Sequence, residues 1–68
     1  MAGISYSSLR AGQKYWLVNF GDRYEFEIME VISSNDFKLK DVHSLEYYNM
    51  SDLIRYGKGK DFEIRDLH

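Results

Sequence analysis

The sequence predicts a small all-β domain in which five short strands form a partly open barrel, with one helical turn before the last strand. Apolar and polar residues alternate at 24–28 and again at 37–40, which is typical of strands with one buried face. Turn-forming residues separate these segments, at Gly21 and at 33–36. The only helix-like segment, 52–56, ends in glycines and precedes a last alternating segment. This order of elements favours a barrel that its last strand closes.

Composition limits both the size of the core and the class of function. At 68 residues, the chain is long enough for one hydrophobic core and too short for two. It has no cysteine, so neither a disulfide nor a thiolate metal site is available. A net charge of −2 argues against a general binder of nucleic acid or of membrane surfaces. Because the sequence also shows neither a signal segment nor a long apolar run, we expect a cytoplasmic protein without membrane contact.

The first half of the chain predicts a tail and two strands. Residues 1–12 are expected to form an N-terminal tail or loose turn, anchored by Tyr6 and Leu9, ahead of a single domain over 13–67. The segment 13–20 has apolar residues at both odd and even positions, which favours a strand largely buried on both sides. A second strand begins at Tyr24, with Tyr24, Phe26 and Ile28 inward. In 29–32 the apolar residues occupy both odd and even positions, which indicates a bulge or sharp bend in the strand.

The second half predicts three more strands and the helical turn. The third strand covers 37–40 with its lysines outward, and the fourth covers 45–50. Ser51 or Asn49 is suited to cap a helical turn over 52–56, and Gly57 supplies the left-handed residue that ends it. The fifth strand, 61–67, directs Phe62 and Ile64 to one face.

Five strands in meander order, a long bent second strand and a one-turn helix before the last strand resemble the SH3-like barrel, and within that group the Tudor-type small barrels. The resemblance covers about 13–67 and rests on element order. The sequence segments 15–18, 45–48 and 53–62 are also similar to segments of short uncharacterised bacterial proteins. The Tudor resemblance implies an aromatic cage for a methylated ammonium at one end of the barrel, near Phe20, Tyr24 and Tyr47, with Tyr48 as a further candidate.

Catalytic, cofactor and metal sites find little support in the sequence. His43 is the only internal histidine and falls in a predicted turn, so no nucleophile, base and orienting group can be assembled around it. No ligand spacing indicates a metal. The stretch 57–60 contains two glycines and two lysines, but a strand follows where a phosphate-binding loop requires a helix. We expect a protein that is not an enzyme and needs no cofactor.

The aromatic residues are the best candidates for function. Trp16, Phe26, Phe37 and Phe62 are expected in the core, because they lie in alternating strands. Tyr47 and Tyr48 are adjacent on a strand and must point to opposite faces, so at least one is exposed or at an interface. Our leading hypothesis is an interaction module that binds a protein segment or a second copy of itself. Its candidate binding residues are Tyr47, Tyr48, Tyr56, Phe20 and Tyr24.

The alternative hypothesis is a small nucleic-acid-binding barrel that uses a cationic patch with tyrosine stacking. The candidate cations are Lys38, Lys40, Arg55, Lys58 and Lys60. Acidic residues at 46, 52, 61 and 63 are interleaved with them, which reduces the field of such a patch.

Overall fold

The structure, a computed structural model, describes residues 4–67 and confirms an all-β fold with five strands and one short helix before the last of them. The elements are the 3-10 turn η1 (Tyr6–Ser8) and, in order, β1 (Lys14–Asn19), β2 (Asp22–Ser33), β3 (Asp36–Asp41), β4 (Tyr47–Asn49), the helix α1 (Met50–Leu53) and β5 (Glu63–Asp66). All strand pairs are antiparallel, in the spatial order β4-β3-β2-β1-β5, and the sheet does not close on itself.

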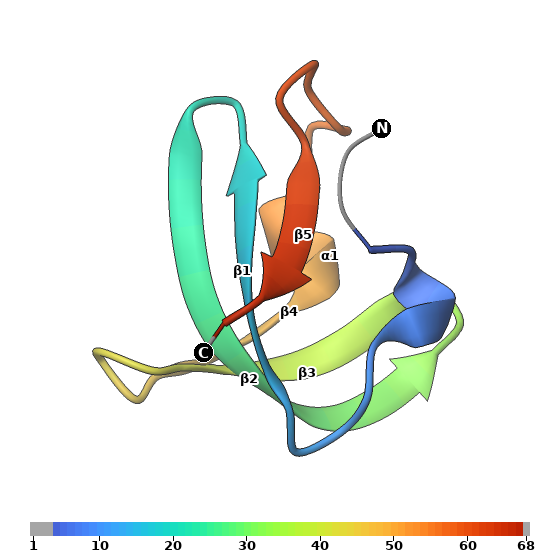
Figure 1. The fold of residues 1–68 in the computed structure, drawn as a ribbon, viewed down its shortest axis with the longest axis vertical. Helices are drawn as coiled ribbons and strands as arrows, with labels where there is room; N and C mark the ends of the chain where they lie inside the picture. The colour runs from blue at the N-terminus through green and yellow to red at the C-terminus, as the bar shows by residue number, and fades with distance from the viewer. Residues whose placement is uncertain (1–3, 68) are drawn as a thin grey trace.

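The long strand β2 connects the two halves of the sheet (Figure 1). Its first half pairs with β1, from Asn19 opposite Asp22 to Lys14 opposite Glu27. Its second half pairs with β3, and the register shifts between Ile28 and Glu30 and again between Val31 and Ser33. The predicted bulge is therefore present, and it explains why the apolar alternation breaks after Ile28.

One hydrophobic core lies against the inner face of this bent sheet. Its fully buried side chains come from four of the strands and from α1: Leu17, Phe26, Ile28, Leu39, Ile64 and Met50. The predicted inward positions of β2 and β3 are confirmed. The prediction for β1 is wrong in one respect, because its odd residues are buried while Trp16 is only half-buried and lies outside the core cluster. The guanidinium of Arg23 covers the Trp16 ring at 4.6 Å from its centroid, which shields this ring without burying it in the core.

The segment before β1 packs onto the core. Leu9 is buried, and the Tyr6 ring meets the Phe37 ring edge-on at a centroid distance of 5.6 Å. The amide of Ile4 donates to the carbonyl of Ile64 over 2.8 Å. These contacts are the anchoring expected for Tyr6 and Leu9; the first three residues of the predicted tail lie outside the described residues.

The helix begins two residues earlier than predicted, at Met50, and β4 is correspondingly shorter. Asn49 is its N-cap, and its backbone amide donates to the Asp52 carboxylate over 3.0 Å. Because the helix starts at Met50, that side chain enters the core and becomes fully buried. Gly57 has the expected positive φ of 93° in the turn after α1.

A cleft between the first hairpin and the helical turn

The turn between β1 and β2 presents an aromatic residue in an unusual backbone conformation. Phe20 and Gly21 have φ values of 52° and 80°, so both central residues of this two-residue hairpin lie in the left-handed region. Asn and Gly are the residues that such turns favour. Phe20 nevertheless occupies the first position, and its side chain is 57% exposed.

The carboxylate of Asp61 holds this turn in place. Its Oδ1 accepts from the Phe20 amide over 2.9 Å, and its Oδ2 accepts from the Gly21 amide over 2.7 Å. The Phe20 ring lies over Gly59, where an added Cβ would come within 2.9 Å of the ring. The tip of the hairpin is thus fixed to the loop between α1 and β5.

Asn19, at the end of β1, connects the same two segments from inside. Its side-chain amide donates to the carbonyls of Leu53 and Gly57 over 3.1 and 3.0 Å. Its Oδ1 accepts from the Gly59 amide over 2.7 Å. Asn19 is the buried polar residue of the core, and all its side-chain polar atoms are used. It therefore satisfies backbone groups at the end of α1 and in the loop that follows.

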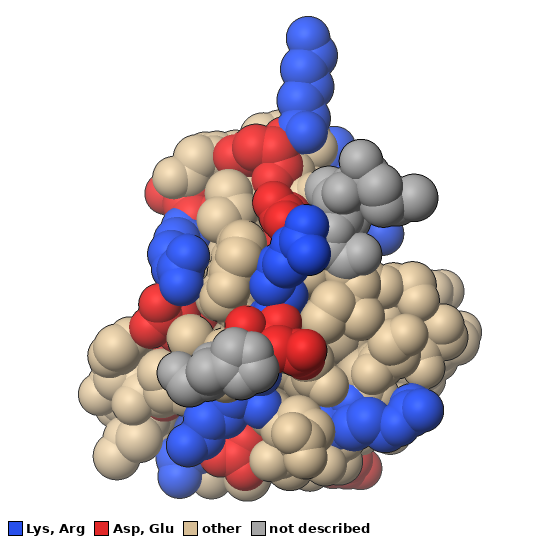
Figure 2. Space-filling model, in the orientation of Figure 1, with Lys and Arg blue, Asp and Glu red and all other residues tan. Residues whose placement is uncertain are grey.

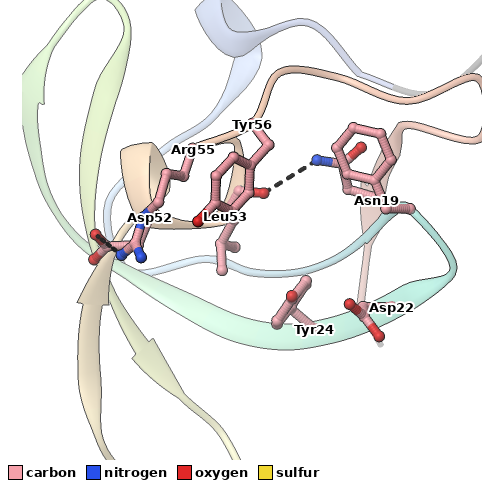
Figure 3. A pocket seen from close by; sticks show the side chains of 8 residues that line it. Asn19, Asp22, Tyr24, Asp52, Leu53, Arg55 and Tyr56 are labelled. Atoms are coloured by element: carbon pink, nitrogen blue, oxygen red, sulfur yellow. Dashed lines mark hydrogen bonds and ion pairs between the residues drawn. The ribbon is translucent and has the colours of Figure 1, made fainter.

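Between the hairpin and the helical turn lies a cleft of about 400 Å³, which we call the hairpin cleft (Figure 3). Tyr24 and Asp22 border it from β2, while Asp52, Arg55 and Tyr56 border it from α1 and the turn that follows. The remaining lining residues are Asn19, Phe20 and Leu53. The side chain of Asp22 has no hydrogen-bond or ion-pair partner among residues 4–67, and Asp52 pairs with Arg55 at 3.5 Å. The cleft therefore combines aromatic surface with a free carboxylate.

The structure brings three of the five predicted binding residues together. Phe20, Tyr24 and Tyr56 all line the hairpin cleft, and Tyr56 is 84% exposed. Tyr47 and Tyr48 do not line it. As expected for neighbours on a strand, they point to opposite faces, with Tyr47 exposed and Tyr48 packed against the core.

Tyr47 and Tyr48 have different environments. The ammonium groups of Lys38 and Lys40 lie 5.2 and 5.8 Å from the centroid of the Tyr47 ring on the outer face of β3 and β4. The Tyr48 hydroxyl donates to Asp41 over 3.2 Å, and burial, followed by the charge of Asp41, raises the pKa of Tyr48. Tyr48 is therefore a structural residue here rather than part of the exposed surface.

The structure does not gather the five candidate cations on one partner, and Lys60 is exposed without a hydrogen bond, ion pair or cation–π contact among residues 4–67. Lys38 and Lys40 lie at Tyr47, while Arg55 pairs with Asp52. The Lys58 ammonium lies over the rings of Tyr6 and Phe62, at 4.4 and 4.9 Å from their centroids. On the face shown in Figure 2, lysines and arginines are mixed with acidic residues rather than gathered in one area.

His43 takes part in an exposed cluster of polar side chains. Its Nε2 contacts Glu25 at 2.5 Å, and Arg23 reaches the other oxygen of Glu25 at 2.9 Å. The hydrogen bond from His43, followed by that from Arg23, lowers the pKa of Glu25. No serine hydroxyl is recorded within hydrogen-bond distance of His43 in the described residues, and these residues contain no group of three or more side chains arranged to hold a metal ion.

Sequence reasoning missed Asn19, Asp22 and Asp61 as site residues. Asn19 could have been found from the sequence, because it is a polar residue among the buried odd-numbered positions of β1, and a buried amide must find hydrogen-bond partners. Asp61 gave no comparable signal, since its partners are 40 residues or more away in sequence.

Comparisons with known proteins add no relative. No family model matches the sequence, and neither a curated protein nor a solved structure matches it significantly. Along residues 4–67, no helix has the length and apolar character needed to cross a membrane.

Proposed function

We propose that this protein is a non-enzymatic interaction module with an SH3-like barrel, and that its hairpin cleft binds an extended protein segment carrying a cationic side chain. The strand order, the bent β2 and the helical turn before β5 support the SH3-like assignment. The single observation that carries the proposed function is the convergence of Phe20, Tyr24 and Tyr56 on one cleft beside a free carboxylate.

The chemistry of the cleft favours a cation. Aromatic faces attract a positive charge, and each such contact contributes about 0.5 to 2 kcal/mol. Asp22 adds a carboxylate without a partner among residues 4–67, so an incoming ammonium or guanidinium would gain an ion pair without breaking one. Phe20 and Tyr56 both line the cleft and are exposed, so their rings are suited to hold the apolar stem of a lysine or arginine.

The test is a heteronuclear NMR titration with acetylated, amidated hexapeptides that differ only at their central residue, which is lysine, trimethyllysine, arginine or glutamate. We expect the cationic peptides to shift the amide resonances of 19–24 and 52–56, with micromolar or weaker affinity, or about −8 kcal/mol at best. Tyr56→Ala should weaken binding about 2- to 30-fold, which corresponds to one lost cation–π contact.

Tyr47→Ala is the matched control, because Tyr47 is also an exposed tyrosine but lies outside the cleft. It should leave peptide affinity unchanged. Equal binding of the glutamate peptide, or an affinity that Tyr56→Ala does not alter, would contradict the proposed site.

Nucleic-acid binding is the second candidate, and the observation that favours it is the proximity of Lys38 and Lys40 to the Tyr47 ring. An exposed ring with two ammonium groups nearby suits base stacking beside a phosphate. The same titration with a short single-stranded oligonucleotide, at low and at high salt, distinguishes the two functions. Salt-sensitive shifts at 38–40 and 47, without shifts in the hairpin cleft, would favour nucleic acid.

A further inference from the structure

The second half of β2 exposes large apolar side chains. Met29, Val31 and Ile32 are 38%, 50% and 50% exposed, and Glu30 is the only charged residue among them. The two register shifts in this segment interrupt the alternation, so these side chains are not confined to one face of the strand. Adjacent exposed apolar residues on one strand are typical of an interaction surface.

The backbone of this segment is also unpaired on one side. The pairing of β1 with β2 ends at Lys14 opposite Glu27, and Gly12 and Gln13 extend it only as far as Ile28. Within residues 4–67, no backbone hydrogen bond joins Met29–Ser33 to any segment other than β3. This part of β2 is therefore an open sheet edge, and such edges readily pair with a further strand.

A groove of about 330 Å³ runs beside this edge, beneath η1, which lies near the end of β2 in Figure 1. Its apolar lining consists of Tyr6, Leu9, Ala11, Val31 and Phe37. Arg10 also lines it. The Arg10 guanidinium donates to the Ser7 carbonyl over 3.2 Å and has no acidic partner in the described part of the chain.

We propose that this edge groove, formed by β2 from Met29 to Ser33 and by residues 6–11, is the interface of a symmetric dimer whose occupant is a second copy of the chain. The surface contains both halves of such a contact: an open strand with exposed aliphatic side chains, and an apolar groove beside that strand. It also contains both charges, because Glu30 of one protomer can pair with Arg10 of its partner. In a two-fold interface each of these contacts occurs twice.

This interface is separate from the hairpin cleft, since the two share no lining residue. The proposed dimer is therefore a property beyond peptide binding, and the test of one does not depend on the result of the other. A dimer would present two hairpin clefts, which raises the apparent affinity for a partner with two cationic segments.

Sedimentation equilibrium of the full chain between about 10 μM and 1 mM tests the proposal. We expect a reversible monomer–dimer equilibrium. Val31→Lys, which places a charge on the open edge, should shift the chain to monomer, while its NMR spectrum still shows a folded domain. Tyr56→Ala should leave the equilibrium unchanged, because Tyr56 lies in the other site.

A charge exchange tests the predicted orientation without relying on Val31. Arg10→Glu and Glu30→Arg should each raise the dimer dissociation constant by about tenfold, and the double variant should restore it to within about threefold of the wild type. A chain that is monomeric at the highest concentration, a dimer that Val31→Lys does not weaken, or a double variant without rescue would each overturn the proposal.

Discussion

At the scale of single residues, Phe20 and Leu45 are the least expected features of this protein. Their φ values are 52° and 65°, a region where ordinary side chains cost about 1–2 kcal/mol. Both side chains are large and more than half exposed, so core packing does not explain the choice of residue. At Phe20 the ring borders the hairpin cleft, and a binding role offers a reason for keeping a strained residue there.

Replacing Phe20 with asparagine separates stability from binding. Asn-Gly is the favoured pair for this turn, so Phe20→Asn should raise the free energy of unfolding by about 0.5–1 kcal/mol despite losing the contact with Gly59. The same change removes an aromatic side chain from the cleft and should weaken the affinity for the lysine peptide several-fold. Urea denaturation and the peptide titration measure the two effects.

Leu45→Asn is the matched control, because it relieves the same backbone strain outside the cleft. It should stabilise the fold and leave peptide affinity unchanged. A Phe20→Asn variant that is less stable and still binds the peptide with wild-type affinity would contradict the assignment of Phe20 to the site.

At the scale of elements, alternation predicted the strands well where one face is buried and the other is solvated. The inward residues of β2 and β3 followed directly from the sequence, and so did the bulge after Ile28. The boundaries of β4 and α1 did not, because the helix begins at Met50, whose burial in the core is a tertiary contact that the local pattern does not show. The sequence predicts Trp16 in the core from its place in an alternating strand, whereas a cation on the neighbouring strand covers its ring.

The hydrogen bonds of Asp41, at the start of the connection between β3 and β4, predict how the stability of the fold depends on acid pH. Asp41 accepts hydrogen bonds from the amides of His43 and Ser44 at 2.8 and 2.9 Å, and from the Tyr48 hydroxyl. These bonds, the Ser44 amide first, lower the pKa of Asp41. A lowered folded-state pKa gives stability that is present above the ordinary carboxyl pKa of about 4 and is lost as pH falls through the lowered value.

Asp41→Asn keeps an oxygen for the two amides but removes the titration. We therefore expect the variant to be less stable at neutral pH and to lose less stability between about pH 5 and pH 2 than the wild type. Thermal unfolding across this range measures the difference. Some acid dependence should remain, because His43 and Arg23 also lower the pKa of Glu25. Parallel pH profiles for the two proteins would contradict the role given to Asp41.

At the scale of the whole molecule, the sequence named aromatic candidates without showing which of them lie together. Phe20, Tyr24 and Tyr56 were recognised as candidates, but Tyr47 and Tyr48 were grouped with them. The hairpin cleft combines segments about 30 residues apart, and only the tertiary fold shows that 19–24 face 52–56 while β4 pairs with β3 at one edge of the sheet. Local patterns contain no information about such a pairing.

Asn19 is the residue through which this long-range arrangement is best tested. Its three hydrogen bonds connect β1 to residues 34 to 40 positions later, so they hold together the two sides of the cleft. Asn19→Ala should lower the free energy of unfolding by about 2–4 kcal/mol, because each lost bond costs about 0.5–1.5 kcal/mol and leaves a partly buried backbone group without its partner. Urea denaturation measures this loss.

Asn19→Asp distinguishes lost hydrogen bonds from lost volume. The carboxylate can still accept from the Gly59 amide, but its second oxygen faces the carbonyls of Leu53 and Gly57, to which the native amide donates. At neutral pH this variant should be less stable than Asn19→Ala, since it places a charge at a site that is only 2% exposed. Its stability relative to Asn19→Ala should improve in acid, where the carboxyl group is protonated and can donate to one carbonyl. An Asn19→Ala variant as stable as the wild type would show that the α1–β5 loop does not depend on Asn19, and the cleft would then need another support.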